Sequence, residues 1–341
     1  MILVFGGGGF IGTYLIDSLA SSGFNPILSD IPPIQVEYYH KRGIPCVQLD
    51  IRDKQAFDFL LGYANNIEAV VNLSCLQPVN VSNKYTDADY IYTNVIGTLN
   101  ILDFCVKNNI KKYVGIISHR GVQGLWEKGE VITEEHKKCL GYDNEYSMFS
   151  ISECSAVDCV EYYGHKHNMQ NIILRLPPVY GYGPHLSGFC EKKPLKSGFM
   201  TFIEKAINND PLALWGDVNR SRDIIYVKDV VSAILLSIQN KKAKGLYNIS
   251  SGKRISLKEE AEEIINVFSS CNNPSKILLQ EDRPNSVEQF LYTIDKAKKE
   301  LQWSPKYNMH DMLVDIKKEM ASGRFSFLVN KRQESFLAAA D

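Results

Sequence analysis

The chain has 341 residues, of which 45% are hydrophobic and 23% charged, a composition typical of folded globular proteins and unlike that of disordered ones. A formal net charge of −1, and no run near the roughly 20 apolar residues of a membrane span, argue against nucleic acid and membranes as partners. The eight cysteines show no C-x-x-C pair and no zinc-type spacing, so we expect no metal site and reduced thiols in a cytoplasmic protein.

Short apolar runs alternate with helical patterns through the first half of the chain. The run at 2–5 ends at glycines, and a helical pattern follows it as far as Gly23. Further strands are predicted at 26–29, 45–49, 68–74, 111–118 and 170–176, and helices at 94–107 and 147–163. Such alternation builds right-handed β-α-β units. We therefore predict an α/β fold with a Rossmann-type doubly wound parallel sheet.

The alternation stops near residue 176, where prolines and glycines become frequent. Later helical patterns cover 199–208, 228–239, 256–268, 294–301 and 309–320. We predict a Rossmann domain over 1–176 with a return segment at 221–250, because the chain is expected to cross back once. A smaller C-terminal α/β lobe over 177–330 would close over the carboxyl edge of the sheet and bind the substrate, and 331–341 would form a weakly ordered tail.

The segment FGGGGFIG places a G-x-x-G-x-x-G pattern between the first strand and the first helix. Gly6 would permit the tight turn, Gly9 would let the backbone approach a pyrophosphate, and Gly12 would let the helix pack against the strand. The helix amino terminus then offers unpaired N–H groups and partial positive charge to the phosphates. Phe10 and Ile11 lie within the same turn and would contact the cofactor. The alternative is a purely structural turn.

Asp30 ends the second strand about twenty residues further on, where a carboxylate accepts hydrogen bonds from an adenosine ribose. A carboxylate there also repels a 2′-phosphate, so the predicted cofactor is NAD rather than NADP. The alternative is that Asp30 is an ordinary turn residue.

Several segments, in order along 1–320, resemble the extended short-chain dehydrogenase/reductases, in particular the nucleotide-sugar epimerases and dehydratases. Besides the glycine spacing, they are LDIRD at 49–53, NLSC at 72–75, NVIGTLNIL at 94–102, LRLPPVYGYGP at 174–184, RDIIYVKDVVSAI at 222–234, GLYNISSG at 245–252 and ELQWSPKY at 300–307. The resemblance implies a bound NAD and a nucleotide-diphosphate sugar in a cleft between two lobes.

The resemblance also implies roles for individual residues. Asp50 and Ile51 would flank the adenine, and Asn94 would brace the neighbouring strand. The remaining cofactor contacts that it implies are Leu73, Ser74, Cys75, Tyr146, Pro178 and Val179.

Three residues stand where relatives contact the sugar nucleotide or the cofactor. Arg222 and Arg283 occupy positions at which relatives hold the diphosphate, and a guanidinium grips phosphate oxygens in a bidentate fork. Gln77 replaces a lysine that epimerase relatives often carry. The alternative for Arg222 is an ion pair with Asp223 or another carboxylate.

The catalytic motif departs from the family pattern. Tyr146 aligns with the catalytic tyrosine, but Ser150 stands where relatives carry the lysine whose charge lowers the tyrosine pKa. His119 falls at the position of the substrate-orienting serine or threonine, with Ser118 one residue earlier. Standard Tyr-Lys chemistry is therefore not expected.

Two replacements for the missing charge remain open. His119 would be an acid/base of its own, or else a packed or solvated residue. Alternatively, a lysine from the loop at 125–141 would reach the site, namely Lys128, Lys137 or Lys138.

Two functions follow from these alternatives. The first is an NAD-dependent epimerase, or less readily a dehydratase or reductase; Arg120 and Gly121 replace the Asp-Glu pair of sugar 4,6-dehydratases. The second is a catalytically impaired protein that binds NAD or a sugar nucleotide as a sensor or partner subunit. A homodimer is expected because relatives pair the helices at 94–107 and 147–163, and the alternative is that both faces are covered within the monomer.

Overall fold

The computed structural model describes residues 1–31, 36–78, 85–183, 187–190, 193–285 and 287–323. The expected tail at 331–341 lies outside these ranges. In the described part of the chain, the central sheet has seven strands in the order β14-β7-β5-β4-β1-β2-β3, and every pair is parallel. The strands are β1 (Ile2–Phe5), β2 (Pro26–Asp30), β3 (Cys46–Gln48), β4 (Ala69–Asn72), β5 (Lys112–Ser118), β7 (Gln170–Leu176) and β14 (Gly245–Asn248).

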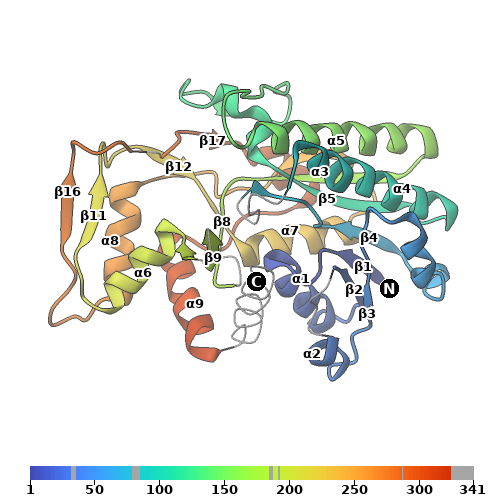
Figure 1. Ribbon diagram of the computed structural model, residues 1–341, viewed down its shortest axis with the longest axis horizontal. Coiled ribbons are helices and arrows are strands. Elements are labelled where there is room, and N and C mark those ends of the chain that lie inside the picture. The colour runs from blue at the N-terminus through green and yellow to red at the C-terminus, as the bar shows by residue number, and fades with distance from the viewer. Residues whose placement is uncertain (32–35, 79–84, 184–186, 191–192, 286, 324–341) are drawn as a thin grey trace.

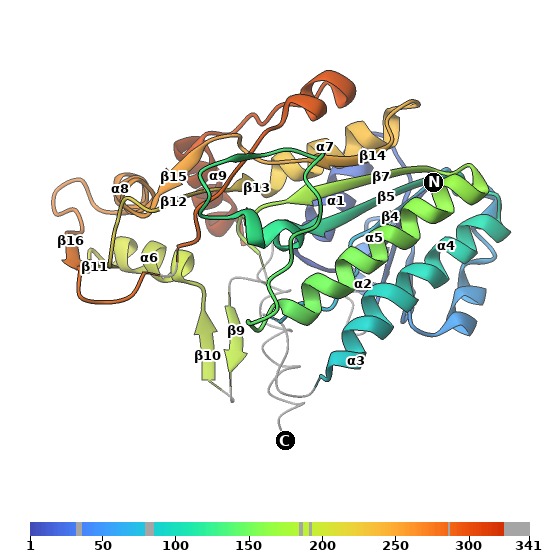
Figure 2. The ribbon, with the colours of Figure 1, turned by 90° about the horizontal axis from the view of Figure 1, so that it is seen from above.

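Helices cover both faces of the sheet (Figures 1 and 2). One face carries α1 (Phe10–Ser21), α2 (Val36–His40) and α7 (Val227–Gln239). The other carries α4 (Gly97–Lys107) and α5 (Ser147–His167), with α3 (Asp87–Tyr90) and the π-helix η4 (Ile91–Ile96) leading into α4. Short 3-10 helices η1 (Lys54–Leu60), η2 (Ala64–Asn66) and η5 (His119–Leu125) complete this part.

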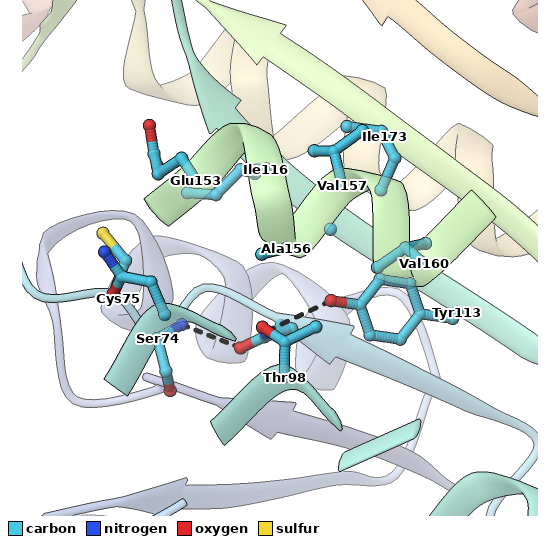
Figure 3. A pocket seen from close by; sticks show the side chains of 13 residues that line it. Ser74, Cys75, Thr98, Tyr113, Ile116, Glu153, Ala156, Val157, Val160 and Ile173 are labelled. Atoms are coloured by element: carbon cyan, nitrogen blue, oxygen red, sulfur yellow. Dashed lines mark hydrogen bonds between the residues drawn. The ribbon is translucent and has the colours of Figure 1, made fainter. Parts of the chain in front are cut away.

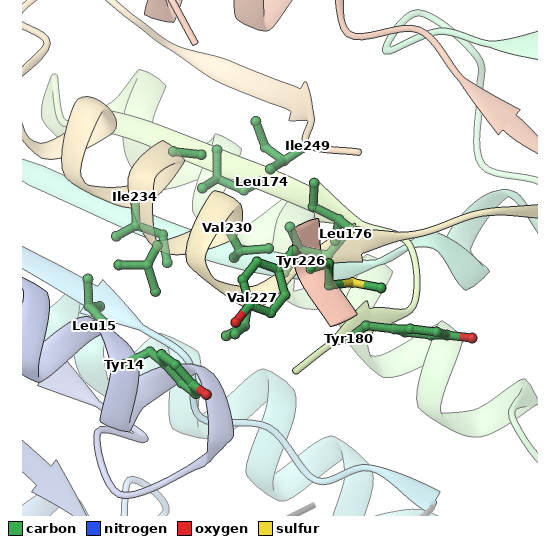
Figure 4. Close-up of a cluster of buried hydrophobic side chains, with 14 of the residues drawn as sticks. Tyr14, Leu15, Leu174, Leu176, Tyr180, Tyr226, Val227, Val230, Ile234 and Ile249 are labelled. Atoms are coloured by element: carbon green, nitrogen blue, oxygen red, sulfur yellow. The ribbon is translucent and has the colours of Figure 1, made fainter. Parts of the chain in front are cut away.

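Side-chain alternation along β1 explains the two layers. Ile2 and Val4 belong to the apolar cluster under α1 and α7, whereas Leu3 and Phe5 belong to the cluster under α4 and α5. Successive side chains of a strand point to opposite faces, so a strand covered on both sides reads as a continuous apolar run. Figure 4 shows Leu15 of α1 and Val230 and Ile234 of α7 meeting in the first of these clusters.

The remaining elements form a smaller lobe beside the sheet (Figure 1). Its helices are α6 (Gly198–Ile207), α8 (Leu257–Phe268) and α9 (Met309–Ser322), and α8 packs against both α6 and α9. Its strands form short pairs: β11 (Leu212–Trp215) with β16 (Ile277–Gln280), β12 (Ser221–Asp223) with β15 (Arg254–Ser256), and β9 (Ser187–Cys190) with β10 (Lys193–Lys196).

Two further strand pairs join the lobe to the region around the sheet. They are β8 (Val179–Tyr180) with β13 (Ile225–Tyr226), and β6 (Val131–Ile132) with β17 (Leu291–Tyr292). The chain returns through α7 and adds β14 beside β7, which completes the predicted doubly wound parallel sheet. The helix expected at 294–301 is present at 295–301, and most of it is the π-helix η7 (Ala297–Leu301).

Candidate active site

The glycine loop joins β1 to α1 with almost no space for side chains. Gly6 has a φ of 73°, and a Cβ there would lie 2.8 Å from the backbone carbonyl carbon of Leu73. At Gly12 a Cβ would lie 2.3 Å from the carbonyl oxygen of Gly6. The first glycine therefore serves the turn, and the last lets the helix start against the loop.

Asp30 lies at the end of β2 beside this loop. Its Oδ2 accepts a hydrogen bond from the Gly8 N–H at 2.9 Å, and its Oδ1 accepts one from the Ile31 N–H at 2.8 Å. The N-cap of α1 is Gly9, which offers no side-chain cap to the first turn of the helix. A loop without side chains, an uncapped helix start and an adjacent carboxylate fit the diphosphate and ribose of a dinucleotide.

Asp50 and Ile51 lie on the turn after β3. Asp50 forms a bidentate ion pair with Arg52, with Oδ2 and Nη2 2.6 Å apart. The Asn100 side chain donates to the Ile51 carbonyl at 2.9 Å, and the missing Cβ of Gly97 leaves room for the Ile51 side chain. Helix α4 thus holds the turn that the resemblance assigns to the adenine.

The segment after β4 is held by Asn94 on the π-helix. Asn94 accepts from the Leu76 N–H at 2.7 Å and donates to the Ser152 hydroxyl at 2.9 Å. This is the bracing contact expected of Asn94. Gln77 donates to the Cys75 sulfur at 3.3 Å. Leu73 and Ser74 are the residues against which a Cβ on Gly6 would collide, so the end of β4 borders the glycine loop.

Tyr146 is half-buried at the start of α5, and its ring carries a cation on one face. The guanidinium carbon of Arg120 lies 3.5 Å from the centre of the phenol ring. Burial raises the pKa of Tyr146 above its usual value, and the charge of Arg120 opposes that rise. Sequence reasoning missed this contact, and the one available signal was the arginine that directly follows His119.

Ser150, one turn after Tyr146, is 2% exposed, and its hydroxyl has no hydrogen-bond partner. A buried hydroxyl without a partner is uncommon, and this one is enclosed by the protein among the described residues rather than open to a ligand.

His119 lies in an aromatic cluster rather than beside a reacting group. Its Nδ1 is 3.1 Å from the Leu176 carbonyl oxygen, and its ring stacks on Trp126 and packs against Phe290. Burial, with a smaller contribution from Arg120, lowers the pKa of His119 to about 3. The imidazole is therefore neutral and enclosed near pH 7, which does not suit an acid/base role. Lys138 is engaged elsewhere, with Asp158 on α5.

Ser118 ends β5 and connects to Glu153 of α5. The Ser118 N–H donates to Glu153 Oε2 at 3.1 Å, and the Ser118 hydroxyl accepts from the Arg120 N–H at 3.3 Å. Glu153 is buried, and burial raises its pKa to about 8. It lines a cavity of about 30 Å³ together with Cys75 and Ser74, as Figure 3 shows. The protonated carboxyl is therefore the main form at neutral pH.

The candidate substrate residues lie in or next to the smaller lobe. Arg222 donates to the Tyr180 hydroxyl at 3.0 Å, and Tyr180 donates in turn to Glu260. Asp223 accepts instead from Ser251 and from the Tyr292 N–H, so the ion pair considered for Arg222 and Asp223 does not form.

Arg283, Pro178 and Val179 are the remaining residues expected to contact the substrate or the cofactor. Arg283 is exposed, with its guanidinium 4.7 Å from the centre of the Trp215 ring. Pro178 and Val179 pair with Ile225 through the backbone where β8 meets β13.

The described residues hold neither a candidate metal centre nor a membrane-spanning helix. No group of three histidine, cysteine, aspartate or glutamate side chains is arranged to hold a metal ion there. Within the same ranges, no helix is both long and apolar enough to cross a membrane.

Comparison with known proteins confirms the resemblance. Residues 2–250 match the model of the NAD dependent epimerase/dehydratase family. A putative UDP-glucose 4-epimerase of Methanocaldococcus jannaschii is 28% identical, over 91% of this chain and 95% of that protein. The UDP-glucose 4-epimerase of Thermotoga maritima, solved with UDP-glucose, superposes with a TM-score of 0.77 at 23% identity, covering 94% of this chain and 98% of that one.

A third similar protein is the UDP-glucose 4-epimerase of Thermus thermophilus in complex with NAD. It superposes with a TM-score of 0.73 at 22% identity, covering 93% of this chain and 97% of the other. The glycine loop, Asp30 and Tyr146 thus lie in a fold shared with these epimerases. The chain belongs to the NAD-dependent epimerase/dehydratase family, a family of enzymes whose cofactor is NAD.

Proposed function

We propose that this protein is an epimerase that acts on a nucleotide-diphosphate sugar through transient hydride transfer. The observation that carries the proposal is the half-buried phenol of Tyr146, which lies under the Arg120 guanidinium where the strand end at Ser118 meets the start of α5. Similar proteins named as UDP-glucose 4-epimerases support this choice over a dehydratase or a reductase.

Each proposed residue has one task in this reaction. NAD held by the glycine loop and Asp30 would supply a reversible hydride acceptor for a sugar carbon. Tyr146 removes the proton of the sugar hydroxyl and later gives one back. The glycine loop and Asp30 would hold the diphosphate and adenosine ribose.

The sugar nucleotide would lie between the sheet and the smaller lobe. Arg222 and Arg283 would neutralise its diphosphate, since guanidinium groups bind phosphate oxygens with two parallel hydrogen bonds. Arg222 is held ready by Tyr180, and Arg283 is exposed at the lobe surface. Gln77 would contact the sugar from the segment after β4.

Incubation with NAD and a panel of UDP- and dTDP-sugars tests the proposal. We expect proton NMR to show interconversion of a sugar with its epimer, beginning with UDP-glucose and UDP-galactose. Tyr146→Phe should slow turnover by roughly 10²- to 10⁴-fold, the usual contribution of a general acid/base. Tyr142→Phe is the matched control, because Tyr142 is 75% exposed nearby. Bound NAD without turnover of any sugar would instead favour the impaired binding protein.

The proposed assembly is a homodimer in the cytoplasm. Tyr92 on the π-helix η4 is 58% exposed, and Tyr162 on α5 is 55% exposed. Helices α4 and α5 lie side by side in Figure 2, and η4 also packs against α5. Large apolar side chains exposed on neighbouring helices favour a protein contact. Cysteines 46, 75, 105, 139, 154, 159 and 271 carry free thiols, which supports a reducing compartment.

A single charge in this layer should separate the subunits. Tyr162→Glu is expected to convert the dimer to a monomer, since a carboxylate at the centre of a contact loses its hydration. Light scattering after gel filtration measures the mass. Phe59→Glu, at a residue that is 71% exposed on η1, should leave the mass unchanged. A wild-type monomer, or a Tyr162→Glu dimer, would contradict the proposed contact.

A further inference from the structure

Relatives place a cation beside the catalytic phenol, and in this chain that position is Ser150, which carries no charge. The positive charge nearest to the Tyr146 ring comes from another element. Arg120 lies on η5, directly after β5, and its guanidinium carbon is 3.5 Å from the ring centre. Cation–π contacts extend to about 6 Å, so this pair is in close contact.

Four contacts hold Arg120 in this place. Its N–H donates to the Ser118 hydroxyl at 3.3 Å, which fixes the backbone at the end of β5. Its guanidinium also lies 5.5 Å from the centre of the Trp126 ring. Its Nη1 reaches Gln123 at 3.5 Å and Glu288 at 3.4 Å. With its side chain only 15% exposed, the guanidinium is held over the phenol before any substrate arrives.

The position of the charge favours one ionisation state of the ring. A phenolate has a more electron-rich face than a phenol, so a cation on that face stabilises the anion more than the neutral form. Arginine keeps its charge at every accessible pH. Burial raises the pKa of Tyr146 most, and the carboxylates of Glu145 and Glu288 add to that rise. The Arg120 cation in contact with the ring face acts against them.

We propose that the Arg120 guanidinium is a positioning residue that supplies the charge lacking at position 150 and favours the phenolate of Tyr146 during proton transfer. This inference rests on the proposed function, because it assigns the charge for the same proton transfer. It moves the cation from α5 to the turn after β5, where the charge of Arg120 opposes the rise in the Tyr146 pKa that burial causes.

The first test needs no turnover. Tyr146 is replaced site-specifically by 3,5-difluorotyrosine, whose ionisation falls at lower pH and is followed by fluorine NMR. In Arg120→Met, which keeps length and loses charge, the midpoint of this titration should rise by about one pH unit or more. Arg120→Lys should lie between Arg120→Met and the parent protein. An unchanged midpoint in Arg120→Met would overturn the proposal, whether or not the protein epimerises sugars.

The second test uses the reaction. Arg120→Met should lower kcat by about tenfold or more, with KM nearly unchanged, and should shift the rising limb of the pH–rate profile to higher pH. Adding Ser150→Lys to Arg120→Met should restore part of kcat and move the profile back. Loss of kcat with an unshifted profile, or no rescue by lysine, would mean that Arg120 acts only through packing.

A matched arginine controls for the loss of a stacked side chain. Arg42 lies 5.1 Å from the centre of the Tyr38 ring near α2, outside the site. Arg42→Met removes a similar cation–π pair and should change neither the fluorine titration nor kcat. If Arg42→Met shifts the titration of residue 146 as much as Arg120→Met does, the effect is not local and the proposal fails.

Discussion

Gly12→Ala is expected to weaken NAD binding by about 100-fold or more. The added Cβ would lie 2.3 Å from the Gly6 carbonyl oxygen and 2.7 Å from the Gly7 backbone. Both neighbours are main-chain atoms, so only a movement of the glycine loop relieves the overlap. Overpacking of this kind costs about 1–3 kcal/mol or more, and every 1.4 kcal/mol is a tenfold change in affinity. Isothermal titration calorimetry with NAD measures the change.

Two further alanine variants calibrate this result. Gly62→Ala meets no atom within 4 Å and should bind NAD as the parent protein does. Gly9→Ala would place its Cβ 3.2 Å from the Gly6 carbonyl oxygen, so an intermediate loss is expected. Circular dichroism confirms that each variant is folded. Parent-like NAD affinity in folded Gly12→Ala would refute the assignment of this loop to the cofactor.

Glu153→Gln is expected to stabilise the protein above neutral pH. Burial raises the pKa of Glu153 from 4.5 to about 8, so the folded state holds a proton that the unfolded state releases. The stability of the parent protein therefore falls as pH rises from about 4.5 to 8. One pKa unit corresponds to about 1.4 kcal/mol, so the loss amounts to several kcal/mol at pH 9. Glutamine keeps the acceptor for the Ser118 N–H and carries no charge.

Urea unfolding at pH 5, 7 and 9 measures this effect. The difference between Glu153→Gln and the parent should be small at pH 5 and largest at pH 9. Glu161→Gln is the control, since Glu161 is exposed on the same helix. An equal difference at all three pH values would show that Glu153 does not titrate in this range. His119 affects stability at low pH instead. Its pKa is lowered to about 3, so the stability that the neutral imidazole contributes is lost as pH falls below about 6.5.

Local patterns were sufficient for most strands of the sheet and for the glycine loop. The runs at 2–5, 111–118 and 170–176 correspond to β1, β5 and β7, because a strand buried on both faces is apolar over most of its length. The glycine loop was equally readable, since its requirement for missing side chains acts between neighbours in sequence.

The catalytic surroundings depended on contacts between distant segments. The sequence pointed to His119, and not to the adjacent Arg120, as a replacement for the missing charge beside Tyr146. The turn of η5 directs His119 into a cluster with Phe290 from the other end of the chain, and it directs Arg120 onto Tyr146. The seven-stranded order of the sheet likewise required β14, which returns from the second half of the chain.

The sequence by itself therefore determined the strand and helix pattern, the glycine loop and the family, because these depend on periodicity and on contacts between near neighbours. Only the tertiary structure decided which cation faces the phenol, that Glu153 is buried and protonated, and that His119 is enclosed. These properties arise from burial and from charges brought together by folding, and a side chain's pKa and partners depend on distances that residue order does not specify.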